Sequence, residues 1–300
     1  MKAVVYERYG PPEVLQLKDI EKPTPKANEI LIRVYSTTVT AGDWRMRKAE
    51  PFIVRIFSGL FKPKRVKILG FELAGVVEEV GKDVKSFKKG DAVFASCGFK
   101  FGGYAEYRCL PENDVIALKP SNMSFDEAAA VPIGGLTAIR LLREAKPKTG
   151  DEILVYGASG SVGTFAVQLA KYYGANVTAV CSGRNLELVR SIGADKVVDY
   201  TKQDFTQLNQ RFDIVFDAVA LIRKSKFKPL LKSGGKFVTV GSNPKDTPTD
   251  LVTLKEIIEA GSLKSVIDRK YTLAQIREAH AYVEQFRKKG NVVVTIFTGD

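Results

Sequence analysis

A glycine-rich segment in the second half of the chain has the residue types and spacing of a phosphate-binding turn. It reads Gly157-Ala158-Ser159-Gly160-Ser161-Val162-Gly163 and directly follows the apolar run EILVY at 152–156. Glycine at 160 would let the backbone approach a pyrophosphate, and glycine at 163 would let a helix pack close to a sheet. The free N–H groups and the dipole at a helix start favour an anion. The segment therefore predicts a dinucleotide site, with a purely structural turn as the alternative.

The residues around this turn have the pattern of the elements that such a site needs. After the turn, apolar side chains recur on one helical face, at Val162, Phe165, Ala166, Leu169, Ala170 and Tyr173, and Gly174 is placed to end the helix. A second apolar run, NVTAVC at 176–181, follows. Ala158 stands where the six-residue fingerprint has its first glycine, a departure that Gly157 offsets. Strand, glycine turn, helix and strand together favour the dinucleotide interpretation.

The end of the second strand decides which dinucleotide is expected. An acidic residue there would bind a ribose 2′-hydroxyl and repel a 2′-phosphate. This segment instead reads Cys181-Ser182-Gly183-Arg184, without a carboxylate. A hydroxyl, a flexible glycine and a guanidinium suit a phosphate monoester. We therefore expect NADPH rather than NADH, with Ser182 and Arg184 in the site; the alternative is that Arg184 is an ordinary surface residue.

Hydrophobic periodicity divides the chain into two domains. Up to about residue 118 the apolar runs are short and β-rich and are separated by turn residues, which predicts a mostly antiparallel β domain. From residue 119 the pattern alternates strand and helix, which predicts a parallel sheet. We expect its strands at 152–156, 176–181, 196–200, 212–219 and 235–241. The last segment, with a strand SVID, a helix over 274–289 and a strand VVVTIF, is expected to return to the first domain. The predicted domains are 1–118 with 264–300, and 119–263.

Composition excludes several classes of protein. The chain has 300 residues, ordinary hydrophobic content and no apolar run near the roughly 20 residues of a membrane span, so we expect a cytoplasmic enzyme without a membrane partner. The formal charge is +12, but no aromatic residues are interleaved among the basic clusters, so a solvated surface is favoured over a nucleic-acid interface. Three separated cysteines and one histidine argue against a zinc site and for a reducing compartment.

Many collinear segments resemble the medium-chain dehydrogenase/reductase superfamily, and within it the zinc-free quinone oxidoreductase (zeta-crystallin-like) and enone reductase branch. The segments include MKAVVYERYGPPEVLQL, ILGFELAGVVEEVGKDVKSFKKGDAVFA, GGYAEY, AAAVPIGGLTA, the GASGSVG turn and SIGADKVVDY. The resemblance implies an α/β protein, with a GroES-like β domain formed by both chain ends and a Rossmann domain with a doubly wound parallel sheet. It also implies NADPH-dependent hydride transfer to a small quinone or α,β-unsaturated carbonyl.

The resemblance further implies positions for site residues. Thr40 and Asp43, in VTAGDW, would lie near the nicotinamide and its ribose, and Thr137 would touch the nicotinamide or the substrate. Tyr200 would lie near the 2′-phosphate. The carboxamide would be flanked by Val240, Gly241 and Ser242.

The chain departs from its relatives at several of these places. Where zinc-dependent members carry Cys and Gly-His-Glu, it has Asp43 and Gly70-Phe71-Glu72, so we expect no metal and a structural Glu72. Thr40 stands where related enzymes often have Asn, and Phe52 where quinone reductases tend to have Tyr. The second departure removes the obvious proton donor and leaves solvent to protonate an enolate.

Three further interpretations concern packing. His280 is predicted to be a packed or hydrogen-bonded structural residue, and Tyr104 in GGYAEY is also interpreted as structural. Trp44 and Arg45 are candidates for shaping the cleft, although an aromatic residue beside a turn more often serves packing.

Two alternatives to the reductase stay open at this point. One is a non-catalytic NADPH-binding or RNA-binding protein of the same fold, and the other is a carbonyl/alcohol oxidoreductase. The length of one connection also bears on assembly. Only SNPKDTPTDLVT separates KFVTVG from the next helix, which is too few residues for a further strand and helix. We expect five strands in the second sheet and a monomer or an atypical dimer.

Overall fold

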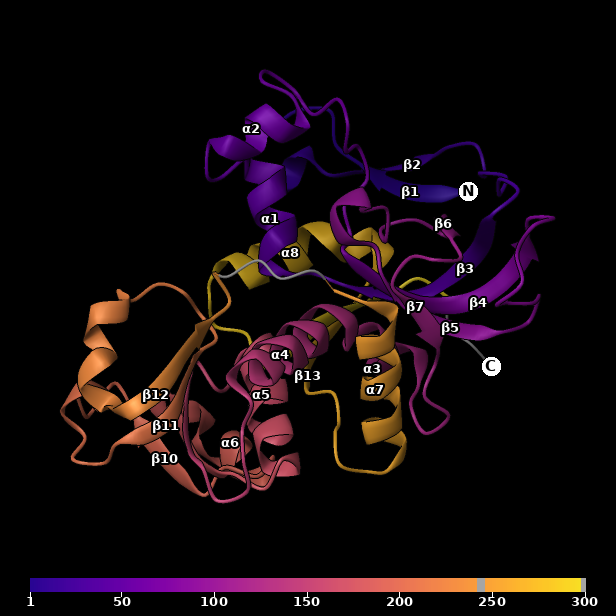
Figure 1. Cartoon of the computed structure of the whole chain (residues 1–300). Coiled ribbons are helices and arrows are strands. Elements are labelled where there is room, and N and C mark those ends of the chain that lie inside the picture. Colours follow the sequence, from indigo (N-terminus) through magenta and orange to yellow (C-terminus); the bar gives the residue numbers. More distant parts are fainter. Residues whose placement is uncertain (242–245, 298–300) are drawn as a thin grey trace. The chain divides into compact units, whose positions relative to one another are not determined.

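The structure, a computed structural model, describes residues 1–241 and 246–297 and divides into two compact units (Figure 1). One unit comprises Met1–Ile133 with Ile267–Asp300, and the other comprises Gly134–Val266. Residues 119–133, which the sequence pattern assigns to the second domain, belong to the first unit instead. The physical reason is Asp126 in helix α3 (Phe125–Ala129), which accepts hydrogen bonds from Ser36 and Thr295 and pairs with Lys270 at 2.7 Å.

The first unit is built around β3 (Glu29–Thr38), a long strand with three strand neighbours. It pairs antiparallel with β4 (Glu72–Val80), with β6 (Tyr107–Pro111) and with β14 (Asn291–Thr295). The sheet is completed by β5 (Ala92–Ser96), β7 (Ile116–Leu118) and β13 (Ile267–Thr272). The pairing of β14 with β3 confirms that the end of the chain returns to the first domain. A separate antiparallel pair is formed by β1 (Lys2–Val5) and β2 (Gln16–Asp19).

Besides α3, three further helices belong to the first unit. Helix α1 (Ala41–Lys48) follows β3 directly, and the short helix α2 (Ile53–Ser58) comes soon after it. Helix α8 (Ile276–Glu284) connects β13 to β14, and because a helix intervenes these two strands run parallel. Arg47 on α1, which is completely buried, pairs with Glu284 and donates from Nε to the Gly10 carbonyl at 3.1 Å. This ion pair joins α1 to α8.

The second unit contains a five-stranded parallel sheet in the order β10-β9-β8-β11-β12. The strands are β8 (Glu152–Tyr156), β9 (Asn176–Cys181), β10 (Lys196–Asp199), β11 (Phe212–Asp217) and β12 (Leu231–Thr239). Both the predicted parallel sheet and its five strands are confirmed within the described residues. Strands β10, β11 and β12 are labelled in Figure 1. The central strand, β8, is almost entirely buried, which fits a sheet covered on both faces.

Helices do not fill every connection of this sheet. The helices are α4 (Pro132–Ala145), α5 (Ser161–Tyr172), α6 (Leu186–Ser191) and α7 (Pro248–Glu259). Between β10 and β11, and between β11 and β12, the described chain makes only 3-10 turns where the alternating pattern suggested helices. Phe205 and Phe227 from these connections join Phe212, the first residue of β11, in one buried cluster. In these two connections aromatic side chains therefore take part in the buried packing in place of a helix.

None of the described helices combines the length and the apolar character needed to cross a membrane.

Candidate active site

The glycine-rich turn joins β8 to α5 with close backbone packing. Gly157 has a φ of +77°, in the region that favours glycine, and a Cβ there would lie 2.2 Å from Val219 Cγ2. A Cβ on Gly163 would lie 2.1 Å from the Gly157 carbonyl oxygen. Both distances are too short for any side chain, so these glycines are required by the turn itself.

Gly160 differs from the other two glycines. A Cβ there would meet only the Gly157 oxygen, at an ordinary 3.5 Å, so the protein alone does not require glycine at this position. Gly160 is also the residue that precedes α5, and it provides no side-chain cap for the first turn. Since the first N–H groups of a helix have no acceptor within the helix, this end of α5 suits an anion, and glycine at 160 leaves room for it.

Asn185 ties this turn to the end of β9. Its Nδ2 donates to Ser159 Oγ at 2.9 Å and to Ser182 Oγ at 3.3 Å, so the two predicted serines share one partner. Asn185 is 4% exposed, and its Oδ1 finds no hydrogen-bond partner among the described residues. Our sequence analysis missed Asn185; the only signal was an amide residue just before an apolar helical run.

The carboxylate of Asp199 lies beside the segment Cys181–Arg184, which contains no acidic residue. The parallel register of β10 and β9 places Asp199 opposite Cys181, and a Cβ on Gly183 would lie 2.4 Å from Asp199 Oδ2. Asp199 accepts hydrogen bonds from Thr201 Oγ1 at 2.7 Å and from the Gly183 N–H. The Thr201 hydroxyl is the main reason that the pKa of Asp199 is lowered, so this group is ionised. Its oxygens hold the loop that carries Arg184, which is exposed.

The remaining predicted residues of the second unit lie on three elements. Thr137 is half-buried on α4, one turn after Gly134. A Cβ on Gly134 would lie 2.8 Å from Ser161 Oγ, so this part of α4 packs closely against the start of α5. Tyr200 follows β10 and is 50% exposed. Val240 and Gly241 follow β12, and Val240 donates its N–H to the Asp217 carbonyl at 3.1 Å. Ser242 lies outside the described residues.

In the first unit, Thr40 and Asp43 form a capping box at the start of α1. Thr40 donates its N–H to Asp43 Oδ2 at 2.8 Å and its hydroxyl to the same oxygen at 2.7 Å, while Asp43 N donates to Thr40 Oγ1 at 3.3 Å. Asp43 Oδ1 accepts from Gly70 N at 2.8 Å. Asp43 is completely buried and Thr40 is half-buried. Of the two predicted residues, only Thr40 faces a surface from which it could meet a ligand.

Two further side chains extend this network inward. The Tyr104 hydroxyl hydrogen-bonds the Asp43 side chain and lies 3.2 Å from His280 Nε2. Burial raises the pKa of Asp43 to about 6, while its hydrogen bonds oppose that rise. Burial also lowers the pKa of His280 well below its usual value, so the ring is neutral at pH 7. His280 is thus a buried, hydrogen-bonded residue, as predicted, and its Nε2 pairs with a tyrosine of the same network.

Glu72 is a second buried carboxylate in this unit. Thr38 donates its hydroxyl to Oε1, and Ile133 donates its backbone N–H to Oε2 at 2.6 Å. Burial raises the pKa of Glu72 to about 7, and the charge of Lys288 opposes the rise. Burial lowers the pKa of Lys288 to about 8. With both oxygens engaged by the protein, Glu72 has a structural role here, as predicted.

Trp44 and Phe52, two aromatic residues that follow Asp43 in the sequence, differ in exposure to solvent. Trp44 is 6% exposed and packs edge-on against Phe286, with ring centroids 5.5 Å apart. Phe52 is 65% exposed. Trp44 therefore has the packing role that was the alternative to shaping a cleft.

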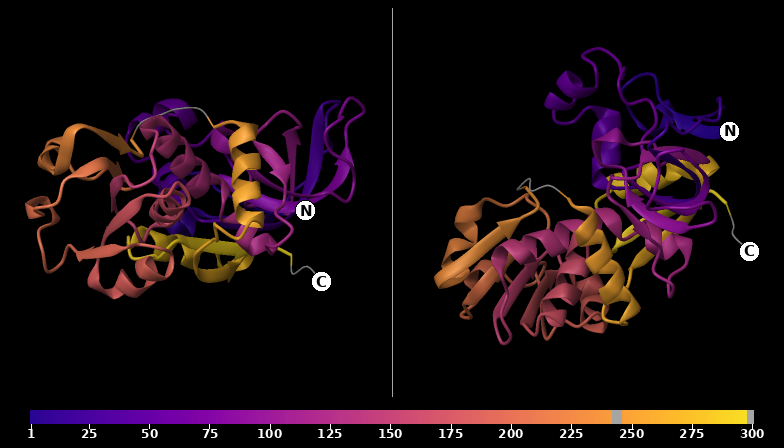
Figure 2. Two further views of the ribbon diagram at one scale, coloured as in Figure 1. Left: turned by 60° about the horizontal axis from the view of Figure 1, so that its bottom comes forward. Right: turned by 45° about the vertical axis from the view of Figure 1, so that its right-hand side comes forward.

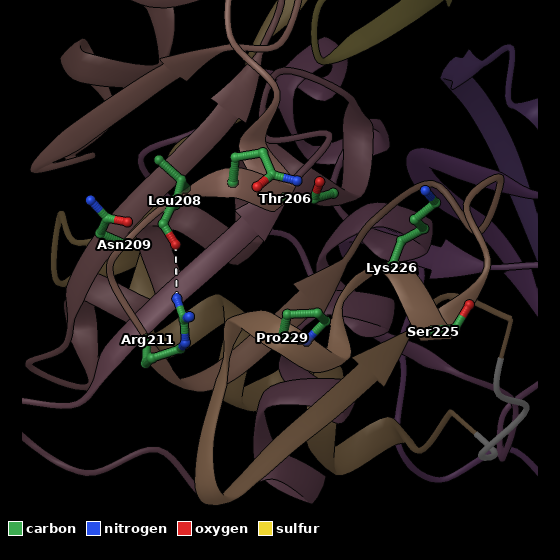
Figure 3. A pocket seen from close by; sticks show the side chains of 8 residues that line it. Thr206, Leu208, Asn209, Arg211, Ser225, Lys226 and Pro229 are labelled. Carbon is green, nitrogen blue, oxygen red and sulfur yellow. Dashed lines mark hydrogen bonds between the residues drawn. The ribbon is translucent and has the colours of Figure 1, made fainter.

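A hollow of about 420 Å³ also lies in the second unit (Figure 3). Its lining comes from the segments just before β11 and β12, namely Thr206, Gln207, Leu208, Asn209, Arg211, Ser225, Lys226 and Pro229. Arg211 is turned toward the Leu208 carbonyl, to which it donates at 2.8 Å. Ligands of parallel sheets bind at the carboxyl ends of the strands, whereas this hollow lies where strands begin. It is therefore distinct from the glycine-rich turn.

Comparison with known proteins identifies the family. Residues 26–120 match the model of the alcohol dehydrogenase GroES-like domain, and residues 161–294 match that of the zinc-binding dehydrogenase. The chain is 36% identical to an NADPH-dependent alkenal/one oxidoreductase of Arabidopsis thaliana, over 98% of this chain and 79% of the relative. It belongs to the medium-chain dehydrogenase/reductase superfamily. Within that superfamily it lies in the quinone and enone reductase branch, and its fold is a GroES-like domain with a Rossmann-like parallel sheet.

Two other members of the superfamily extend this likeness. Human quinone oxidoreductase is 33% identical over 93% of each chain. The solved structure of the quinone oxidoreductase from Coxiella burnetii is 26% identical and superposes with a TM-score of 0.86, covering 99% of each chain. The likeness thus spans both units rather than one shared domain.

Among the described residues, the positions that resemble the zinc-ligand positions of metal-dependent superfamily members form no metal-binding cluster. The carboxylate oxygens of Asp43 and Glu72 accept hydrogen bonds from protein donors. Phe71, between Gly70 and Glu72, has no atom that could bind a metal. Within residues 1–241 and 246–297, no three Cys, His, Asp or Glu side chains gather as a metal site. The donor set therefore does not fit a catalytic zinc ion.

Proposed function

We propose that this protein is a zinc-independent oxidoreductase that uses NADPH to reduce a quinone or an α,β-unsaturated carbonyl compound. The observation that carries the proposal is the contrast among the three glycines of the turn. Gly157 and Gly163 are required by packing, whereas Gly160 leaves open space before an uncapped helix. That space suits the pyrophosphate of a dinucleotide.

Each end of the cofactor has candidate partners in the second unit. The pyrophosphate would lie against Ser159, Gly160, Ser161, Val162 and Gly163. The 2′-phosphate would meet Ser182, Arg184 and Tyr200, since a guanidinium pairs well with a phosphate monoester. Asn185 Oδ1, buried without a partner among the described residues, is free to accept a hydroxyl of the cofactor. The carboxamide end would be flanked by Val240, Gly241 and Ser242.

The chemistry then divides between the cofactor and the protein. Bound NADPH supplies the hydride. Thr40 and Thr137 would orient the nicotinamide or the substrate through their hydroxyl groups, and correct orientation lowers the barrier to transfer. Asp43 acts as a positioning residue, because it is buried and holds Thr40 through three hydrogen bonds. Solvent delivers the proton to the reduced substrate, since Phe52 carries no hydroxyl.

A substrate panel tests this proposal. Quinones, alkenals and simple ketones are offered in turn while NADPH oxidation is followed, with and without a chelator. We expect turnover of quinones or alkenals, little turnover of ketones and no effect of the chelator. Chelator-sensitive turnover would contradict the zinc-independent mechanism. Absence of turnover on every substrate, with NADPH still bound, would favour a non-catalytic NADPH-binding protein.

Compartment and assembly belong to the same proposal. We place the protein in the cytoplasm, and its three free cysteines suit a reducing compartment. We propose a monomer or an atypical dimer, because β12 forms the edge of a sheet of only five strands. Light scattering that shows a stable dimer joined through this edge would contradict the assembly proposal. Nucleic acid is not among the proposed partners, and binding that weakens steeply with salt would argue otherwise.

A further inference from the structure

The first unit exposes a concentrated group of large apolar side chains, here called the apolar patch. Six of them lie within ten residues of the sequence, and the most exposed are Phe61, at 87%, and Ile56, at 70%. Monomeric proteins rarely leave so many neighbouring apolar side chains in water without an interaction that covers them. The members are Phe52, Ile53, Ile56, Phe57, Leu60, Phe61 and, from another loop, Phe99.

Helix α2 carries this patch on its outer face. Val54 packs against the core and Ser58 is completely buried, whereas Ile53, Ile56 and Phe57 are exposed. An ordinary surface helix has the reverse arrangement, with apolar residues inward and polar residues outward. Phe99 joins the patch through Phe57, with ring centroids 6.0 Å apart.

A basic segment follows the apolar patch immediately. Lys62, Lys64, Arg65 and Lys67 are exposed, and they alternate with the buried residues Pro63 and Val66. No Asp or Glu occurs from Pro51 to Phe71. Within the part of the chain that the structure describes, none of these four cations forms a salt bridge. The charges of Lys62 and Lys67 act on the carboxylate of Glu7, which pairs with Lys18. The positive charge of this segment is therefore largely uncompensated.

Hydrogen bonds hold both features in a defined conformation. Tyr9 donates its hydroxyl to the Gly59 carbonyl at 2.6 Å, and the N–H groups of Lys64 and Arg65 donate to the Ser58 carbonyl at 2.9 and 3.2 Å. Arg55 lies over the Tyr9 ring, 4.9 Å from its centroid. Figures 1 and 2 show α2 and the loop after it at the outer edge of the first unit. The patch is thus a preformed surface with apolar and basic parts side by side in the sequence.

We propose that α2 and the basic segment dock the protein on an anionic phospholipid surface. Aromatic and aliphatic side chains would enter the boundary between headgroups and acyl chains, while Lys62, Lys64, Arg65 and Lys67 would meet the negative headgroups. A second copy of the chain fits poorly, because a symmetric contact would bring the same cations together. Nucleic acid would engage the cations but leave Ile53, Ile56 and Leu60 in water. Peripheral binding of this kind differs from the expectation of no membrane partner, which was drawn from the absence of a spanning segment.

Cosedimentation of the full chain with vesicles tests this proposal. The vesicles contain phosphatidylcholine alone, or phosphatidylcholine and phosphatidylserine in equal amounts, at low and high salt. We expect binding to the phosphatidylserine vesicles that weakens with salt. The double variant Lys64→Glu/Arg65→Glu should reduce binding at least about tenfold, because each cation near an anionic surface contributes several-fold to affinity. The matched control Lys88→Glu/Lys89→Glu changes charge equally at two exposed lysines of the same unit and should keep binding.

A second pair of variants separates the apolar part from the charge. Ile56→Ser/Phe61→Ser should also lose vesicle binding about tenfold, whereas Tyr172→Ser, which removes a 51% exposed aromatic residue of the other unit, should not. NADPH affinity and thermal unfolding serve as folding controls and should stay unchanged in all four variants. Three results would overturn the proposal: no binding by the wild-type chain, equal losses in the control variants, or unchanged vesicle binding with altered KM in Ile56→Ser/Phe61→Ser. The folding controls also separate a failure here from a failure of the proposed reductase activity.

Discussion

The two candidate regions, one in each unit, differ in whether side chains are absent or present where a ligand could bind. In the second unit the turn after β8 depends on residues without side chains. Glycine at 157 and 163 permits close backbone packing, and glycine at 160 leaves room before α5. In the first unit Thr40 is held by side chains, through Asp43 and then Tyr104. Adding an atom should damage the first kind of site, and removing a group should damage the second.

The largest effect is expected from Gly163→Ala. Its new Cβ would lie 2.1 Å from the Gly157 oxygen and 2.8 Å from Ala158 Cα, and both atoms are backbone. We expect the free energy of unfolding to fall by about 3 kcal/mol, the upper range for overpacking, and NADPH binding to be lost. Urea unfolding and NADPH titration measure the two effects.

Gly160→Ala is the matched control for that substitution. Its Cβ would be 3.5 Å from the nearest atom, so unfolding should change little while NADPH affinity drops. Equal destabilisation by both alanines would contradict the distinction among the glycines.

Asp43→Ala makes the complementary change in the first unit. It leaves the buried N–H groups of Thr40 and Gly70 without their acceptor, which should lower the free energy of unfolding by about 2 kcal/mol. Turnover should also fall, because Thr40 is no longer held. Asp83→Ala, at an exposed carboxylate of the same unit, should stay within about 0.5 kcal/mol of wild type. A similar loss in both variants would remove the special role of Asp43.

The buried carboxylates also predict a pH dependence of stability. Because the pKa of Asp43 is raised from 3.8 to about 6, the unfolded chain loses this proton first as pH rises. Stability contributed by the protonated form is therefore full below about pH 4 and is lost as pH approaches 6. Asp43→Asn should gain on wild type by on the order of 2 kcal/mol between these pH values, measured by urea unfolding. A difference between the two proteins that does not change with pH would show that Asp43 titrates normally.

The smallest effect is expected from Arg184→Ala. Removing an exposed guanidinium from the predicted 2′-phosphate site should weaken NADPH binding about tenfold and leave NADH binding unchanged. Arg190→Ala removes an exposed cation from the following helix and should alter neither affinity. If Arg184→Ala weakens both cofactors equally, the loop after β9 does not select between them.

Local sequence patterns predicted the second unit more fully than the first. The runs at 152–156 and 176–181 coincide with β8 and β9, because buried parallel strands are continuous apolar segments bounded by turns. Residues 119–133, which the sequence pattern groups with the second domain, lie in the first compact unit, since the contacts of Asp126 with Ser36, Thr295 and Lys270 join residues distant in sequence. Asn185 and Asp199 were missed for the same reason.

By itself the sequence determined the class of fold and the glycine turn, because periodicity and turn chemistry depend on neighbouring residues. The family came from the resemblance of many collinear segments. Only the tertiary structure decided which polar groups are buried and what they contact. Asp43 is buried and accepts hydrogen bonds from Gly70 and Tyr104. The pairing of β10 with β9 places the Asp199 carboxylate beside Gly183. The outward apolar face of α2 was also a tertiary result, since Val54 and Ser58 occupy the side that faces the core. Burial and long-range hydrogen bonds depend on contacts between distant segments, which no local pattern encodes.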